Sequence, residues 1–277
     1  GIWDCTGVRS VVAAPYGADG NAILIRATEP DVFWNARSIT AIPIPEEGQI
    51  PLGGTGTFYV RVAFESSQIN GAWGLVANTA PGPEDTNPQA DDPTHNYGDL
   101  RPNGSHRPGD SIIAAYDNIE QSWWRLVSPE APVFEPETWY EFWYLIENLS
   151  DEEGGGWYDI FVAGGQFGDE PVHMPNPYLP SELEQAGVTQ WNFRGGVAEG
   201  PLARFLNILG SGPGDDPVGS GAVFFNALYS APGELTLERP SENNGGGEPD
   251  TWYGYEVDAE GWALTDDWMG WVNVAFD

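Results

Sequence analysis

The sequence contains no lysine, and its ten basic residues are all arginine. Against 42 aspartates and glutamates, these arginines leave a formal net charge of −32 over 277 residues. A surface this negative repels nucleic acid phosphates and anionic lipid headgroups, so neither is expected as a partner. Self-repulsion also destabilises the compact state unless ions screen it, and at high salt the Debye length falls to roughly 3–5 Å. We therefore expect an extracellular or cell-surface protein of a saline environment.

Cysteine and long apolar runs are also scarce. Cys5 is the single cysteine, so an intrachain disulfide and multi-cysteine metal sites are excluded. A buried, inert thiol and an intermolecular disulfide both stay open for Cys5. No apolar run approaches the length that a membrane-spanning helix needs, and no membrane span is expected.

Turn-forming and aromatic residues, in contrast, are abundant. The chain has 36 glycines and 24 prolines, which favour short strands joined by loops over long helices. Residues 55–65 alternate between apolar and mixed positions, which predicts a strand with one buried and one exposed face. Residues 138–148 and 156–164 predict a hairpin, and residues 180–186 give the one helical signal, with Ser181 as its N-cap. The sequence thus predicts an all-β protein.

The organisation along the chain suggests one large domain and a small addition. Residues 1–239 carry most of the strand signals, and residues 240–250 have the composition of a linker. Residues 251–277 form a β-rich appendage that is too short for a core of its own, so it must dock on the main body or on another molecule. Its tryptophans are the predicted assembly residues: Trp252, Trp262, Trp268 and Trp271.

Three segments carry a family resemblance. Residues 19–25 (DGNAILI), residues 138–143 (TWYEFW) with their hairpin partner 157–162, and residues 221–229 (GAVFFNALY) resemble elements of the concanavalin A-like, or laminin-G-like, jelly roll. In the third segment the family usually has an aspartate, and this chain has asparagine and alanine. The resemblance covers roughly residues 7–239 and implies a two-sheet antiparallel jelly-roll sandwich. The tail is similar to short aromatic modules at the C-termini of exported bacterial surface proteins.

The catalytic signals are incomplete. Jelly-roll glycosidases need two carboxylates close together on one strand. No such run occurs, since Glu141 and Glu147 lie ~20 Å apart along a strand. A second possibility is a loop at residues 95–107, where Arg or Asn would neutralise a uronate carboxylate and Tyr or His would move the proton, as in a polysaccharide lyase. Its candidate residues are His95, Tyr97, Arg101, His106 and Arg107. The alternative is a polar loop held by Arg–Asp pairs.

Two kinds of binding site are also predicted. Paired carboxylates in Pro- or Gly-bounded loops suit Ca²⁺, although a solvated acidic surface explains each pair as well. The candidate metal ligands are Asp91, Asp92, Asp215 and Asp216. Trp123, Trp124 and Trp143 are candidates for stacking on sugar rings, and the net charge favours a neutral glycan. Because Trp123 and Trp124 are adjacent, we expect one of them to face away from the ligand.

Three functions follow from these observations. The first is a non-catalytic structural protein that associates with copies of itself into a filament, layer or matrix, and the missing catalytic pair and the aromatic tail favour it. The second is a glycan-binding jelly-roll module. The third is a polysaccharide lyase that uses residues 95–107.

Overall fold

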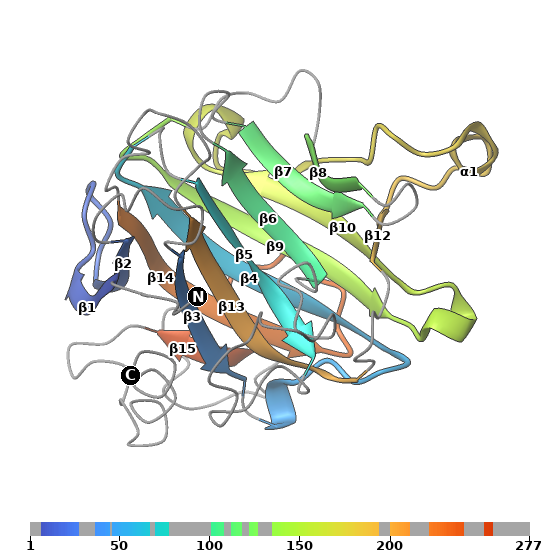
Figure 1. Cartoon of the computed structure of the whole chain (residues 1–277), viewed down its shortest axis with the longest axis horizontal. Coiled ribbons are helices and arrows are strands. Elements are labelled where there is room, and N and C mark those ends of the chain that lie inside the picture. The colour runs from blue at the N-terminus through green and yellow to red at the C-terminus, as the bar shows by residue number, and fades with distance from the viewer. Residues whose placement is uncertain are drawn as a thin grey trace, which may run out of the picture.

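The computed structural model describes residues 7–27, 37–44, 46–66, 70–77, 101–107, 112–117, 122–126, 135–193, 200–210, 222–240 and 252–256. Within these ranges the chain forms two antiparallel sheets that pack face to face (Figure 1). The helical elements are short: η1 (Glu46–Gly48), η4 (Asp151–Glu153), η5 (Gly165–Phe167) and α1 (Ser181–Gln185). None of the helices in the described ranges has the length and apolar character needed to span a membrane.

The larger sheet has nine strands. Its order is β1-β2-β14-β4-β9-β10-β11, with β12 beside β10 and β15 beside β14. The strands are β1 (Gly7–Ala13), β2 (Asn21–Ala27), β4 (Gly54–Phe64), β9 (Trp139–Asn148), β10 (Gly156–Ala163), β11 (Val172–His173), β12 (Trp191–Phe193), β14 (Ala222–Pro232) and β15 (Tyr253–Glu256).

The second sheet has six strands in the order β3-β13-β5-β6-β7-β8. The strands are β3 (Arg37–Pro43), β5 (Asn70–Ala77), β6 (Arg101–Arg107), β7 (Ile112–Asp117), β8 (Ser122–Leu126) and β13 (Leu202–Gly210). The predicted fold, an all-β antiparallel jelly-roll sandwich of two sheets, is confirmed.

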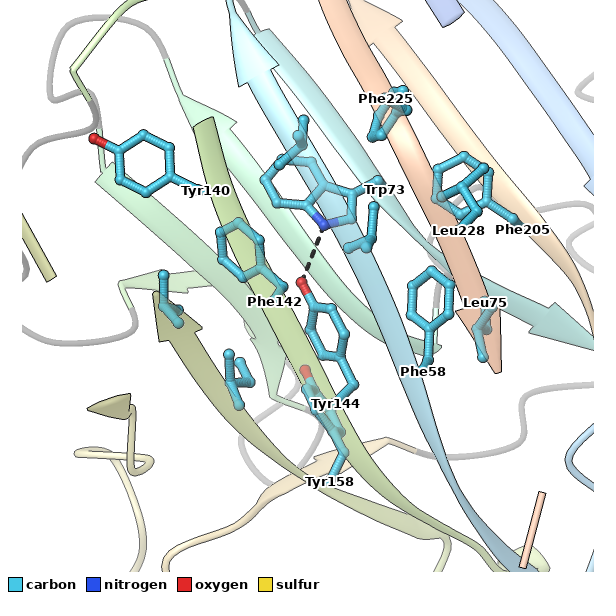
Figure 2. Close-up of a cluster of buried hydrophobic side chains, with 14 of the residues drawn as sticks. Phe58, Trp73, Leu75, Tyr140, Phe142, Tyr144, Tyr158, Phe205, Phe225 and Leu228 are labelled. Atoms are coloured by element: carbon cyan, nitrogen blue, oxygen red, sulfur yellow. Dashed lines mark hydrogen bonds between the residues drawn. The ribbon is translucent and has the colours of Figure 1, made fainter. Parts of the chain in front are cut away.

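The core lies between the sheets and is built largely from aromatic side chains. Alternate residues of β4 and β9 point into it, as the sequence pattern predicts, and β5 and β13 close it from the other side. Trp73 of β5 donates a hydrogen bond from Nε1 to the hydroxyl of Tyr144 on β9, at 3.0 Å. Figure 2 shows this bond among the packed rings. It joins the two sheets in the middle of a largely apolar core.

The prediction of an exposed outer face for β4 is wrong. Tyr59 and Ala63, on that face, are buried. Tyr59 packs with Trp143, Tyr229 and Trp252 in a second cluster outside the main core. This cluster exists because distant parts of the chain cross the sheet, and a local sequence pattern does not report such contacts.

The start of the predicted appendage joins the large sheet. β15 pairs with β14, so that Tyr253 lies opposite Ser230, and the ring centroids of Trp252 and Tyr59 lie 6.1 Å apart. Trp252 therefore docks on the main body. Trp262, Trp268 and Trp271 lie outside the described residues, and the division at residues 240–250 stays a prediction.

Candidate functional site

The polar residues predicted to lie in a loop instead form a strand of the six-stranded sheet. β6 pairs with β5 on one side and β7 on the other, so the loop assignment is wrong for residues 101–107. His95 and Tyr97 lie outside the described residues. The sequence of β6 (RPNGSHR) contains no large apolar residue, although both neighbouring strands are rich in them. Because packing favours apolar residues at such a position, this polar strand is a candidate for function.

The strand register divides the polar residues between the two faces. Trp73 and Leu75 of β5 lie in the core, so the alternating positions 72, 74 and 76 belong to the outward face. Asn103 pairs with Gly74 and Ser105 with Ala72, and directly opposed residues share a face. Arg107 therefore belongs to the outward face. His106 pairs with Gly71, on the face of Trp73, so the five predicted catalytic residues do not form one group.

Besides Asn103, the outward face contains three more residues that the sequence reasoning missed. Arg204 of β13 pairs with Val76, and Arg37 of β3 pairs with Gly210, which itself pairs with Asn70. On β7, Ala114 pairs with Ser105, so Tyr116 is the next outward position of that strand. Because β6 and β7 are antiparallel, Tyr116 lies towards the same end of the sheet as Asn103 of β6. The register thus gathers one set of polar positions on the outward face: Arg37, Asn103, Arg107, Tyr116 and Arg204.

A β-bulge changes the interpretation of the adjacent tryptophans. Between the pairs Ala115–Arg125 and Asp117–Ser122, β7 advances by two residues and β8 by three. Trp123 and Trp124 therefore stand together opposite Tyr116, and strict alternation between faces does not apply to them. They lie in the same sheet as β6, two strands away. A second bulge interrupts the pairing of β6 with β5, between Arg101 and Asn103.

Trp143, the third predicted stacking residue, is a structural residue of the other sheet. It is fully buried, its Nε1 donates to the backbone oxygen of Glu238 at 3.2 Å, and the Arg239 guanidinium lies 5.4 Å from its ring centre. Its ring offers no face to a sugar, and this excludes a stacking role.

Charge differs between the two sheets. The strands of the six-stranded sheet contain five arginines, one histidine and a single carboxylate, Asp117. The strands of the nine-stranded sheet contain three arginines and four carboxylates. Half of the arginines of a chain with charge −32 are thus found on one small sheet. A scan of predicted strands for arginine without carboxylates would have found this signal.

Residues 233–239, here called the strap, cover part of the nine-stranded sheet. The Thr57 hydroxyl donates to the backbone oxygen of Glu234 at 2.7 Å and accepts from the Thr236 amide at 3.0 Å. Arg239 at the strap's end forms an ion pair with Glu141, with Nε 2.7 Å from Oε2. Beneath the strap, burial and then the nearby Glu141 carboxylate raise the pKa of the Tyr59 hydroxyl. This tyrosine is therefore a neutral structural group.

A second polar group lies on the outer face of the nine-stranded sheet. His173 Nε2 is 2.8 Å from Asp159 Oδ1, and the Thr189 hydroxyl lies 3.4 Å from the same oxygen. The His173 ring stacks on Phe161, with centroids 4.7 Å apart. Nothing in the local sequence pattern predicts this group, because its members meet through strand pairing.

The predicted metal ligands Asp91, Asp92, Asp215 and Asp216 lie outside the described residues, and Ca²⁺ binding stays a prediction. In the described part of the chain, no group of three or more His, Cys, Asp or Glu side chains is arranged to hold a metal ion.

Several solved structures are similar to this chain. An endo-β-1,4-glucuronan lyase from the fungus Trichoderma reesei matches with a TM-score of 0.48 and 10% identity, over 82% of this chain and 88% of that chain. A marine alginate lyase from Aplysia kurodai matches with a TM-score of 0.45 and 12% identity, over 80% and 86% respectively. The alginate lyase Aly36B matches with a TM-score of 0.41 and 12% identity, over 79% and 82%. No protein-family model and no curated protein matches the sequence.

These similar structures are polysaccharide lyases with sandwich folds, and this finding contradicts the first functional hypothesis, a non-catalytic structural protein that self-associates. At these identities the likeness concerns the fold alone. The reaction has to be argued from the residues of this chain.

Proposed function

We propose that this chain is a polysaccharide lyase of the concanavalin A-like type, and that it cleaves a uronate-containing polymer on the outward face of the six-stranded sheet. The supporting observation is that the strands of this sheet carry five arginines and one carboxylate, and that the strand register assigns three of the arginines, Arg37, Arg107 and Arg204, to the outward face. Arginine binds carboxylates through paired, charge-assisted hydrogen bonds, which suits a polymer that carries a carboxylate on its sugars.

The net charge does not oppose this proposal. At physiological ionic strength the Debye length is ~8 Å, so exposed charges farther away than this are largely screened. Arg204 lies opposite Val76 and Arg107 lies beside the position of Asn70, so a polymer that runs obliquely over β13, β5 and β6 passes close to the two arginines in turn. The carboxylates on other parts of the molecule then contribute little to its binding.

The residue types on this face match the steps of an elimination. A base removes the proton from the carbon next to the uronate carboxylate, the bond from the adjacent carbon to the glycosidic oxygen breaks, and a carbon–carbon double bond forms. The leaving oxygen receives a proton, so no water is consumed. Neutralising the carboxylate acidifies the carbon proton, and we assign this role to Asn103, while Arg107, ~13 Å along the same strand, binds the carboxylate of another sugar. Tyr116, the neighbouring position on β7, is assigned the proton transfer.

The experiment follows the absorbance of the unsaturated product with polymers of glucuronate, mannuronate, guluronate and galacturonate. Tyr116→Phe should lower kcat by a factor of ~10²–10⁴ with the fold intact, since it removes only the group that transfers the proton. Tyr16→Phe is the matched control, because Tyr16 packs on the opposite sheet, and it should leave kcat unchanged.

Two results would contradict the proposal. One is the absence of unsaturated product from every polymer. The other is the appearance of new reducing ends without that absorbance, because it would indicate hydrolysis.

A further inference from the structure

We propose a second carbohydrate site, for a neutral hexose chain, on the outer face of β10. Trp157, Asp159 and Phe161 alternate with core residues of the same strand, so all three belong to the face that points away from the six-stranded sheet. Each of the three is partly exposed. We call this set the β10 strip. It lies on the opposite side of the sandwich from the proposed lyase site and does not depend on it.

Trp157 gives the strip its stacking surface. Phe161 lies ~13 Å farther along the same face of the strand, where His173 stacks on its ring and the side chain packs against the cluster of Tyr59 and Trp143, so Phe161 offers a ligand only the exposed edge of its ring. Partly exposed aromatic rings attract the apolar C–H faces of sugar rings. Because the spacing exceeds the width of one pyranose, only an oligosaccharide can stack on Trp157 and contact the edge of Phe161 at the same time.

The indole of Trp157 has an unused donor. Within the part of the chain that the structure describes, Trp139, Trp143 and Trp191 donate their Nε1–H groups to backbone oxygens at 2.8, 3.2 and 3.0 Å. Trp157 makes no such bond to any described residue, and its Nε1 is not among the buried unpaired atoms of the described residues, so this donor is accessible to a ligand. A sugar hydroxyl can accept this bond while the ring stacks.

Asp159 supplies a matching acceptor between the two rings. A carboxylate can only accept, so His173 donates from Nε2 to Asp159 Oδ1, and Thr189 lies beside the same oxygen. Among the described residues, the hydrogen bonds to Asp159 use Oδ1, which leaves Oδ2 for sugar hydroxyls. His173 also stacks on Phe161. The strip is therefore held in place before a ligand arrives, which lowers the entropic cost of binding.

The charge of the strip selects neutral chains. Asp159 lies within it, and Glu147 on β9 stands directly opposite Trp157. His173, the basic side chain beside the strip, already donates to Asp159. A uronate chain would therefore meet like charge at close range, whereas the hydroxyls of a neutral chain find acceptors.

The experiment titrates the whole chain with neutral gluco-, manno- and galacto-oligosaccharides, followed by calorimetry. We expect a hexasaccharide to bind and the matching monosaccharide to give no signal. Trp157→Ala should weaken binding by ~tenfold or more, because it removes one stacking ring and one donor. The affinity of Trp157→Phe should lie between those of the original chain and Trp157→Ala, because this variant keeps a ring and loses the N–H. It also serves as the conservative variant if Trp157→Ala unfolds.

Leu235→Ala is the control, since Leu235 is half exposed on the strap and is not part of the strip. It should bind as the original chain does. Product formation from uronate polymers should be unchanged in Trp157→Ala, which separates this site from the proposed lyase site. The inference is overturned if no neutral oligosaccharide binds, if Trp157→Ala binds as well as the original chain, or if uronate chains compete equally for the strip.

Discussion

The hydrogen bond between Trp73 and Tyr144 offers a direct test of how the two sheets are joined. Both side chains are fully buried, and the bond crosses from β5 to β9 at 3.0 Å (Figure 2). Tyr144→Phe removes one oxygen atom and keeps the ring. The Trp73 N–H then loses its acceptor in a largely apolar core, and a buried unpaired donor costs ~1–3 kcal/mol.

This loss is large relative to the total stability of a folded domain, which is ~5–15 kcal/mol. We therefore expect Tyr144→Phe to lower the unfolding midpoint in urea while leaving the m-value unchanged, because the surface exposed on unfolding hardly changes. In a thermal scan, each kcal/mol lost should lower Tm by ~2–4 °C for a domain near this size.

A double-mutant cycle separates the bond from general packing. In a Trp73→Phe background there is no N–H to leave unpaired, so Tyr144→Phe should cost clearly less there than in the original chain. If Tyr144→Phe lowers the free energy of unfolding equally in the two backgrounds, the loss does not come from the unpaired Trp73 N–H. A loss below ~0.5 kcal/mol in the original chain would also refute the reasoning, because another group would then have to satisfy the Trp73 donor.

Two further predictions concern alkaline pH and close packing. Burial raises the pKa of Tyr140 to about 12, so its contribution to stability is complete below the ordinary pKa of 10.0 and is lost as pH rises through 12. In urea unfolding from pH 9 to 12, the free energy of unfolding should fall less steeply with pH for Tyr140→Phe than for the original chain. The same dependence on pH in both proteins would contradict this. A Cβ at Gly156 would lie 2.1 Å from Cζ of Phe193, so Gly156→Ala should cost ~1–3 kcal/mol in denaturant midpoint, whereas Gly200→Ala, with Ala77 at an ordinary 3.8 Å, should change little.

The sequence predicts well those parts of the fold that depend on local pattern. Period-two alternation identifies β4 and β9 and their core faces, and the acidic, glycine-rich connection at 149–155 gives the hairpin with β10. The short helix is also predicted, although its N-cap is Pro180 and not Ser181. The outer face of β4 is different. Thr57 bonds to Glu234, 177 residues away, and no pattern within one strand reports that contact.

The candidate site shows the same limit. The residue types at 95–107 give uronate chemistry as one of three functional hypotheses, but the division of residues 101–107 between two faces depends on pairing with β5. Arg204 and Tyr116 lie far apart in the sequence and reach one face only through the order β13-β5-β6-β7. The Trp123–Trp124 pair illustrates the point further, because the bulge opposite Tyr116 removes the alternation that the sequence argument assumes.

The net charge predicts a neutral ligand only if charge is spread evenly over the molecule. A ligand interacts mainly with charges within a Debye length, ~8 Å at physiological salt, so the composition of each face matters more than the total. The six-stranded sheet concentrates arginine on its strands, and the nine-stranded sheet carries more carboxylates than arginines on its own. The same net charge is therefore compatible with an anionic polymer on one face and a neutral chain on the other. The remaining acidity acts on solubility and salt dependence, which are properties of the whole surface.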